Sequence, residues 1–297
     1  MLNAVTVREL LSEGIIRLKS PSPNALVDSP GLDAALLLAE VLGTDRPGLI
    51  IAGPNFVDET IRRRYADLLD RRLSGLCTAY ILGRREFRGL EFGVSHQVLV
   101  PRPDTEILVE AVLDWVKKQA NRDGPPLKVL DLCTGSGAVA IALKHECPEL
   151  SVTASDISAG ALEIAAANAA RLLGADGAVT FIQSDLFENI ADVPFDLIIA
   201  NPPYIASGII DGLAPEVRRE PRLALDGGED GLNLIRRIIH EAPGQLQKTG
   251  RKGGAIFLEA DSGQMDSIRQ ILEKEGFRDI EVRKDLADLQ RVISGSI

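Results

Sequence analysis

Residues 195–204 read Phe-Asp-Leu-Ile-Ile-Ala-Asn-Pro-Pro-Tyr, an apolar run that ends in an amide, two prolines and an aromatic ring. Such a run is typical of a strand buried on both faces of a parallel sheet. Proline cannot donate a hydrogen bond to a neighbouring strand, so the strand must end before Pro202. Asn201 is therefore expected at the carboxyl end of a parallel strand, where open α/β sheets bind their ligands.

The chemistry of this turn suits a planar group that carries an NH2. The Asn201 side chain offers one acceptor oxygen and two donor hydrogens. Pro202 and Pro203 stiffen the backbone, so that the carbonyl groups beside Asn201 point in fixed directions. Tyr204 adds a flat apolar face with a polar tip. Taken alone, these residues are also ordinary turn chemistry, so other parts of the chain must distinguish a site from a simple turn.

Composition places the chain among globular proteins. Its 297 residues are 45% hydrophobic and 26% charged, which is typical of a protein with about two domains. No apolar run reaches the roughly 18 residues of a membrane span, and the first residues lack a secretory pattern. The three cysteines and three histidines are scattered and form no metal-binding spacing. We therefore expect a cytoplasmic protein with free thiols, no membrane contact and no metal site.

The net charge of −10 is unevenly distributed along the chain. Residues 1–100 carry 12 basic and 12 acidic side chains, so the whole acidic excess lies in the remainder. An acidic second part argues against a long nucleic-acid footprint there. The basic residues of the first part cluster at 62–64, 71–72 and 84–85 and at Arg88. These clusters are either a solvated helix face or a docking edge for an acidic or RNA-bound partner.

Periodicity divides the chain into three parts. Residues 1–80 carry apolar side chains at three- and four-residue steps and predict a small helical bundle. Residues 81–103 include an alternating segment with turn glycines, which predicts a β-hairpin. From residue 104 onward, a helix that Asp104 is expected to cap is followed by alternating strands and helices. The predicted strands lie at 128–132, 151–155, 179–183, 254–259, 280–283 and 291–293, besides the one that ends at Asn201. Repeated strand–helix units predict a parallel sheet with helices on both faces, and the last two strands predict a closing hairpin.

Three candidate ligand positions follow consecutive strands. Residues 131–137, Asp-Leu-Cys-Thr-Gly-Ser-Gly, join the first strand to its helix and match neither the dinucleotide fingerprint nor a phosphate-binding loop. A less negatively charged ligand is therefore implied. Asp156 ends the second strand, where an acidic side chain commonly binds ribose hydroxyls. Asp185 and Leu186 follow the third strand, where a carboxylate and an apolar side chain could hold a purine. A single strand-end Asp is often a helix cap, but three positions converge on one edge of the sheet.

Together these motifs resemble class I S-adenosylmethionine-dependent methyltransferases. The Asn-Pro-Pro-Tyr form marks members that methylate planar amino or amide nitrogens. Further segments at 83–87, 101–106, 220–225 and 285–292 are similar to one branch, the bacterial glutamine methyltransferases of peptide chain release factors. The resemblance covers essentially the whole chain beyond residue 75, and the helical N-terminal domain is of the expected kind.

The resemblance implies a fold, an activity and partners. The fold is an α/β class I methyltransferase (Rossmann-like) sheet with a C-terminal antiparallel hairpin, preceded by a small helical bundle and a β-hairpin linker. Residues 1–80 are expected to dock the substrate, 81–103 to form the linker and 104–297 to be the methyltransferase domain. The expected enzyme is a protein-glutamine N-methyltransferase that methylates the Gly-Gly-Gln loop of release factors with S-adenosyl-L-methionine. No direct nucleic-acid substrate is expected.

The resemblance also assigns roles to residues. Asn201 and the carbonyl of Pro202 are expected to accept both hydrogens of the substrate amide, with Pro203 and Tyr204 packing against the amide plane. The expected cofactor-binding residues are Cys133, Thr134, Gly135, Ser136, Gly137, Asp156, Asp185, Leu186 and Asn201. Many relatives carry glycine in place of Cys133 and some carry tryptophan in place of Leu186. We therefore expect local differences in the backbone at Cys133 and in adenine packing at Leu186.

Two other functions compete with this interpretation. One is an adenine amino-group methyltransferase acting on DNA or RNA, which uses the same Asn-Pro-Pro-Tyr chemistry but needs a basic groove or a channel for a flipped base. The other is a non-catalytic cofactor-binding module that docks a translation factor. The acidic second part speaks against the first, and the intact turn at 201–204 speaks against the second. Methyl transfer tried on both release factor and DNA would separate the three functions.

Overall fold

The computed structural model describes residues 5–20, 22, 25, 27–119, 125–174, 178–248 and 253–297. The chain divides into two compact units. Unit 1 comprises residues 1–84 and 212–219, and unit 2 comprises residues 85–211 and 220–297. Sequence periodicity does not indicate that residues 212–219 belong with the helical unit.

Unit 1 is a small helical bundle. Its helices are α1 (Val7–Lys19), α2 (Pro30–Leu42), α3 (Arg46–Ala52), α4 (Glu59–Leu73) and α5 (Thr78–Leu82), and two short strands, β1 (Val5–Thr6) and β2 (Phe56–Val57), pair antiparallel. Helix α1 begins with a capping box, in which the Thr6 hydroxyl accepts from the Glu9 backbone and the Glu9 carboxylate accepts from the Thr6 backbone. One apolar core, which includes Leu37, Leu38 and Tyr65, holds the helices together.

Gly14 of α1 packs directly against Tyr65 of that core. A Cβ atom at Gly14 would lie 2.0 Å from the hydroxyl of Tyr65 and 2.7 Å from its Cζ. Tyr65 is fully buried, and its hydroxyl donates to the Ala34 carbonyl at 3.1 Å. The ring therefore cannot move aside without breaking a buried hydrogen bond.

We expect Gly14→Ala to destabilise unit 1 by about 1–3 kcal/mol, because overpacking forces side chains off their preferred rotamers. The measurement is the free energy of unfolding from denaturant titration. Gly31→Ala in α2 is the matched control, since a Cβ there would meet nothing within 4 Å. Equal free energies of unfolding for the two variants would show that the Tyr65 ring shifts to make room for the added methyl group without loss of stability.

A buried arginine ties residues 212–219 to the rest of unit 1. Arg72 of α4 is 4% exposed, and its Nε donates to Asp33 at 2.8 Å while its Nη1 donates to Glu216 at 3.3 Å. Arg219 donates to the Ser74 carbonyl at 2.7 Å. The segment that leaves the Asn-Pro-Pro-Tyr turn therefore enters the helical unit before it returns to unit 2 at Glu220.

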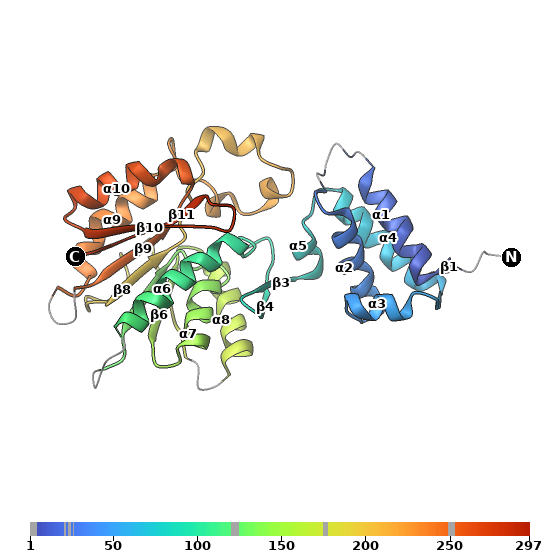
Figure 1. The fold of residues 1–297 in the computed structure, drawn as a ribbon, viewed down its shortest axis with the longest axis horizontal. Helices are drawn as coiled ribbons and strands as arrows, with labels where there is room; N and C mark the ends of the chain where they lie inside the picture. Colours follow the sequence, from blue (N-terminus) through green and yellow to red (C-terminus); the bar gives the residue numbers. More distant parts are fainter. Residues whose placement is uncertain are drawn as a thin grey trace. The chain divides into compact units, whose positions relative to one another are not determined.

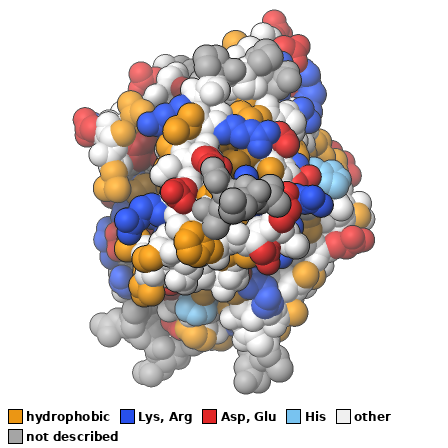
Figure 2. Space-filling model, turned by 90° about the vertical axis from the view of Figure 1, so that its right-hand side faces the viewer, with side chains coloured by type: hydrophobic (Ala, Val, Ile, Leu, Met, Phe, Trp, Pro, Cys, Tyr) orange, Lys and Arg blue, Asp and Glu red, His pale blue; other side chains and the backbone are white. Residues whose placement is uncertain are grey.

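The basic clusters are not one uniform docking edge or solvated face. Arg72 is buried in ion pairs, whereas Arg63 and Arg64 are exposed on α4. Arg88 pairs with Glu146 and Glu110 within unit 2. On the face seen in Figure 2, Lys and Arg side chains lie scattered among acidic and apolar ones.

The predicted hairpin is present. Strands β3 (Arg84–Phe87) and β4 (Leu90–Gly93) pair with each other, and Arg88 and Gly89 connect them. Both connecting residues have positive φ, +50° and +74°, as a type I′ turn requires. Phe87 and Phe92 stack edge to face with centroids 6.0 Å apart, which anchors the hairpin in the core of unit 2.

A seven-stranded sheet organises unit 2. Its strands are β5 (Lys128–Leu132), β6 (Ser151–Asp156), β7 (Thr180–Gln183), β8 (Leu197–Ala200), β9 (Ala255–Glu259), β10 (Arg278–Lys284) and β11 (Gln290–Ser296), in the order β10-β11-β9-β8-β5-β6-β7. Strands β5 to β9 are parallel, and β10 and β11 form the antiparallel hairpin at one edge. The chain runs outward from β5 to β7 and then returns to place β8 on the other side of β5. The carboxyl ends of β5 and β8 are therefore the topological switch point, where such sheets bind ligands.

Helices cover both faces of this sheet (Figure 1). They are α6 (Glu106–Lys118), α7 (Ala138–Glu146) and α8 (Ala159–Leu173) on one face and α9 (Asn233–Gln245) and α10 (Met265–Lys274) on the other. Alternate strand residues divide between the two cores: Val129 and Ile199 belong to one, Leu130 and Ala200 to the other. The predicted fold class is thus confirmed.

The predicted cap at Asp104 is wrong. Residues Pro103–Thr105 form a 3-10 turn without a side-chain cap, and α6 begins after Thr105. Asp104 instead pairs with Arg291 of β11 at 3.4 Å. The cause is tertiary, because the strand that carries Arg291 lies 187 residues further along the chain.

Candidate functional site

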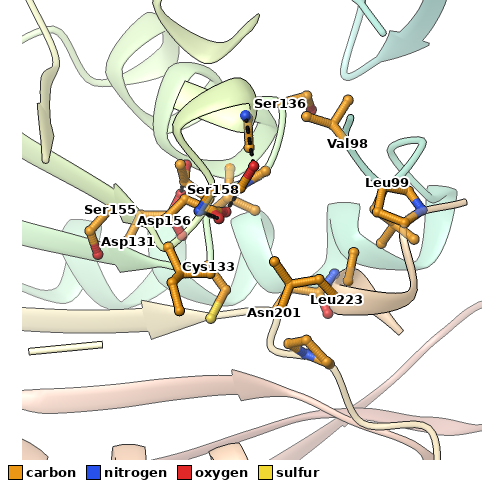
Figure 3. Close-up of a pocket in the computed structure, with 18 of the residues that line it drawn as sticks. Val98, Leu99, Asp131, Cys133, Ser136, Ser155, Asp156, Ser158, Asn201 and Leu223 are labelled. Carbon is orange, nitrogen blue, oxygen red and sulfur yellow. Dashed lines mark hydrogen bonds between the residues drawn. The ribbon is translucent and has the colours of Figure 1, made fainter. Parts of the chain in front are cut away.

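A cavity of about 250 Å³ lies at the switch point, entirely within unit 2. The loops after β5, β6, β7 and β8 all contribute to its lining, since their strands end at the same edge of the sheet. Figure 3 places Asp131, Asp156 and Ser155 toward one end and Asn201 and Leu223 toward the other, with Cys133 between them. Of the predicted site residues, the structure brings together Cys133, Thr134, Gly135, Ser136, Asp156, Asp185, Leu186, Asn201 and Pro203 as lining residues.

Gly137, Pro202 and Tyr204 are predicted site residues that do not line this cavity. A Cβ at Gly137 would lie 2.8 Å from Ile141 Cδ1, so this glycine permits close packing of the loop on α7 and α8. Pro202 is buried beneath the turn. Tyr204 is half-buried and packs against the apolar core on the α9 and α10 side.

The loop after β5 has a left-handed backbone at three positions. Cys133, Gly135 and Gly137 have φ of +57°, +55° and +80°. Glycine adopts this conformation freely, whereas any residue with a side chain is strained in it. Cys133 therefore has a backbone conformation typical of glycine and is strained there. Burial, with Asp156 and Asp131 nearby, raises the pKa of the Cys133 thiol. The thiol therefore stays neutral and is unsuited to act as a nucleophile.

Asp156 organises the loop as well as the cavity. Its Oδ2 accepts from the Gly135 backbone at 2.9 Å, and its Oδ1 accepts from the Ser158 backbone at 2.9 Å. Burial raises its pKa, and these two hydrogen bonds oppose the rise. Each carboxylate oxygen retains a second lone pair that can accept from a ligand hydroxyl.

Asp131 is a further acid on the cavity wall, and it is 1% exposed. Its Oδ2 accepts from the Thr134 hydroxyl at 2.6 Å. Burial raises its pKa to about 7, and the bond from Thr134 opposes the rise. A cation in the cavity would hold this carboxyl ionised at neutral pH.

The loop after β7 presents Asp185 and Leu186. Asp185 Oδ1 accepts from Arg237 Nη1 of α9 at 3.0 Å, and both side chains line the cavity. Leu186 is buried and has a φ of +50°, which turns its backbone sharply at the cavity wall.

Asn201 is held by a residue that sequence reasoning did not single out. Its Nδ2 donates to Thr105 Oγ1 at 3.1 Å, and Thr105 is 4% exposed. This bond directs the amide nitrogen away and leaves Oδ1 as the acceptor. No cluster of His, Cys, Asp and Glu in the described part of the chain is arranged to hold a metal ion.

Two segments complete the cavity without an obvious sequence signal. Val98 and Leu99 precede the 3-10 turn, and Leu223 and Ala224 lie in the segment after Glu220. Glu220 is buried and holds the first segment by accepting from the Val100 backbone at 3.0 Å and from Arg102. The pairing of 101–106 with 220–225, both noted as family-like segments, could have indicated this contact.

The donor set fits S-adenosylmethionine, a cationic nucleoside. Three carboxyl groups, from Asp131, Asp156 and Asp185, line the cavity. Arg237, which pairs with Asp185, and Arg102 line it as well, so carboxyl groups outnumber cations by one, which suits a ligand of positive charge. The Gly135 position is open, since a Cβ there would meet nothing within 4 Å. The backbone can therefore approach a ligand closely at this loop.

Comparison with known proteins relates the chain to a known family. Two family models match: "PrmC N-terminal domain" over residues 9–83 and "Methyltransferase small domain" over residues 105–214. A release factor glutamine methyltransferase of Bordetella pertussis is 41% identical over 90% of this chain and 94% of its own length. One of Moorella thermoacetica is 37% identical over 97% of both chains.

Solved structures are similar in fold. The hMettl16 catalytic domain in complex with a 3'UTR hairpin has a TM-score of 0.57 at 15% identity, over 77% of this chain and 82% of that one. A methyltransferase from Pyrococcus furiosus has a TM-score of 0.50 at 17% identity, over 71% and 90%.

The strand order and the cavity at the switch point define a class I methyltransferase, whose methyl donor is S-adenosylmethionine. The identity to the two bacterial relatives extends over both units. The chain belongs to the release factor glutamine methyltransferase family.

Proposed function

We propose that this protein transfers a methyl group from S-adenosylmethionine to the side-chain amide nitrogen of a glutamine in peptide chain release factors, the glutamine of the Gly-Gly-Gln loop. The observation that carries the proposal is the Asn201 amide, which Thr105 holds by its nitrogen at the edge of an acidic cavity. When bound, the donor supplies a methyl group on a sulfonium, and the sulfur leaves as a neutral thioether.

Asn201 and Pro202 form the clamp for the substrate amide. An amide nitrogen is a poor nucleophile, because its lone pair is delocalised into the carbonyl. The Oδ1 of Asn201 and the backbone carbonyl of Pro202 would accept its two hydrogens and hold the nitrogen facing the methyl group, at a near-attack distance of about 3 Å. The same two oxygens would stabilise the positive charge that grows on nitrogen as the new N–C bond forms, until one N–H proton is released to solvent. Pro203, which lines the cavity, packs against the amide plane, whereas Tyr204 supports the turn from the core.

The acids and the loop after β5 hold the donor. In this proposal Asp156 accepts from the ribose hydroxyls, Asp185 and Leu186 border the adenine, and residues 133–137 approach the methionine portion. Asp131 and the other carboxylates balance the sulfonium charge. The Cys133 thiol is not a methyl acceptor in this proposal, since burial raises its pKa and keeps it neutral.

Asp156→Asn should weaken S-adenosylmethionine binding by about 1.5–3 kcal/mol, because hydrogen bonds to a charged group are lost and one backbone bond loses its acceptor. Isothermal calorimetry on the purified variant measures this. Asp192→Asn, an exposed acid beyond β7, is the control. Unchanged affinity in Asp156→Asn would mean that Asp156 does not contact the donor and serves only to accept from the Gly135 and Ser158 backbones.

Methyl transfer from labelled donor tests the function itself. The substrates are release factor, release factor with the loop glutamine changed to alanine, DNA and RNA. Label on intact release factor alone is the expected result. Label on a nucleic acid would instead favour the adenine methyltransferase, and no label on any substrate would favour the non-catalytic module.

Unit 1 docks the release factor in this proposal. Specific protein interfaces bury about 1,200–2,000 Å², far more than one glutamine loop offers, so a second contact surface is needed. Unit 1 exposes large apolar side chains on neighbouring short elements: Ile50 and Ile51 of α3 are 79% and 81% exposed, and Phe56 of β2 is 71% exposed. We call these three residues the α3 patch.

The partners and place of action follow from this substrate. Release factors act in translation termination, so we infer a cytoplasmic location and no direct nucleic-acid substrate. Among the described residues, no helix combines the length and the apolar character needed to cross a membrane.

A further inference from the structure

A buried carboxyl group lies directly beside Asn201. Glu259 is the last residue of β9 and is 1% exposed. Ala200 of β8 pairs with Leu258 of β9, so the next residues, Asn201 and Glu259, leave the two neighbouring strands at the same level. The clamp formed by Asn201 Oδ1 and the Pro202 carbonyl does not include Glu259.

Hydrogen-bond donors face this carboxyl group. The side chains of Thr105 and Asn201 both face it, and both lower its pKa. Asn201 Nδ2 also donates to Thr105 Oγ1 at 3.1 Å. Because the Thr105 hydroxyl accepts from Asn201, its own hydrogen remains available to Glu259. Thr105 and Asn201 are thus joined by a hydrogen bond, and Glu259 is the acceptor that both side chains face.

This set leaves one acceptor unsatisfied. Among the described residues, Glu259 Oε2 has no hydrogen-bond partner although it is buried. A buried polar atom without a partner opposes folding, so stability does not explain why a carboxyl group stands here. A role in the reaction would explain it.

We propose that Glu259 is the positioning residue that fixes the direction of the Asn201 amide. The inference rests on the proposed function of Asn201 as the substrate clamp. A carboxylate only accepts hydrogen bonds, so it attracts the NH2 of Asn201 and repels the oxygen. Oδ1 must then face the cavity, where it can accept an N–H from the substrate and cannot donate. The clamp therefore selects a glutamine amide, presented by its nitrogen, over a glutamate carboxylate or an amide presented by its oxygen.

The charge of Glu259 also acts on the reaction. Its negative charge polarises the Asn201 amide and stabilises the positive charge that develops on the substrate nitrogen. Protonated Glu259 loses this charge and turns one oxygen into a donor, so the ionised form is the active one.

Several charged groups face Glu259 and set its ionisation. Burial raises its pKa to about 7, with a smaller rise from Asp104, while Thr105, Arg291 and Asn201 lower it. Arg291 is itself paired with Asp285 at 2.8 Å. Tyr204 faces the same carboxyl and stays neutral, because burial, with Glu259 nearby, raises its own pKa. We therefore expect kcat to rise with pH across neutral pH, because the Glu259 carboxyl group loses its proton there.

The test compares three variants by steady-state methylation of release factor across neutral pH. Glu259→Gln should lower kcat by about 10²-fold through misplacement of the clamp, leave KM for release factor nearly unchanged, and abolish the rise of kcat with pH. Thr105→Val should also lower kcat but keep the pH rise, since Glu259 remains. Asp196→Asn is the control: its carboxylate accepts from the Lys128 backbone at 2.8 Å near the amino end of β8, so kcat and the pH profile should match wild type.

A second readout does not depend on turnover. Carbon-13 NMR of protein labelled at glutamate carboxyl groups should reveal one resonance that titrates near neutral pH and disappears in Glu259→Gln. Thermal unfolding should find that variant at least as stable as wild type. A folded Glu259→Gln with wild-type kcat, or one that keeps the pH rise, would overturn the proposal. Two separate measurements test the clamp itself: methylation of release factor by wild type, and its loss in Asn201→Ala. If these succeed while Glu259→Gln behaves like wild type, only the role of Glu259 fails.

Discussion

Asn201→Ala is expected to lower kcat for release factor methylation by about 10²–10³-fold, the usual effect of removing one preorganised contact to the reacting group. The substrate amide would keep the Pro202 carbonyl as an acceptor but lose the second, so its nitrogen would no longer be held in line with the methyl group. Single-turnover methylation with saturating donor measures the loss.

Binding of S-adenosylmethionine and the free energy of unfolding should change little in this variant, since Asn201 is half-buried at a strand end and the acids hold the donor. Asn233→Ala is a matched control, because Asn233 is exposed at the start of α9 and does not line the cavity. Near-normal turnover in Asn201→Ala would mean that another group holds the substrate amide.

The second large effect is expected at the α3 patch. Ile50→Asp combined with Ile51→Asp should lower kcat/KM for whole release factor by about 10–100-fold, because charged side chains cannot be desolvated in an apolar contact. Activity on a short peptide that contains the Gly-Gly-Gln loop should not change, since such a peptide lacks the further surface of the release factor that would contact unit 1. Both positions are solvent-exposed, so the core around Leu49 stays intact.

Leu286→Asp is the matched control, because Leu286 is a fully exposed leucine of unit 2. Surface substitution is a sharper test than deletion of unit 1. Deletion would strip Glu216 of its partner Arg72 and expose residues 212–219, which continue into the cavity segment after Glu220. An equal loss on protein and peptide in the α3 variant would place the docking surface elsewhere.

Local sequence determined the elements and the chemistry of the central turn. An apolar run closed by Asn201 and Pro202 predicts a buried strand that ends there, because proline removes the next ladder donor. Alternation of strand and helix patterns determined a parallel sheet, and the glycine turn determined the β3–β4 hairpin. These features depend on residues close together in the chain, whose periodicity and turn preferences are recorded directly in the sequence.

Tertiary structure alone decided which distant residues meet. Thr105 lies 96 residues before Asn201 and yet holds its amide nitrogen, and Glu259 closes the same set from β9. In the sequence Glu259 is simply the polar end of an apolar strand, indistinguishable from a residue that enters solvent. Arg72 likewise reads as part of a basic helix face, but Asp33 and Glu216 bury it. Sheet order and packing create such pairs, and neither leaves a periodic signal in the chain.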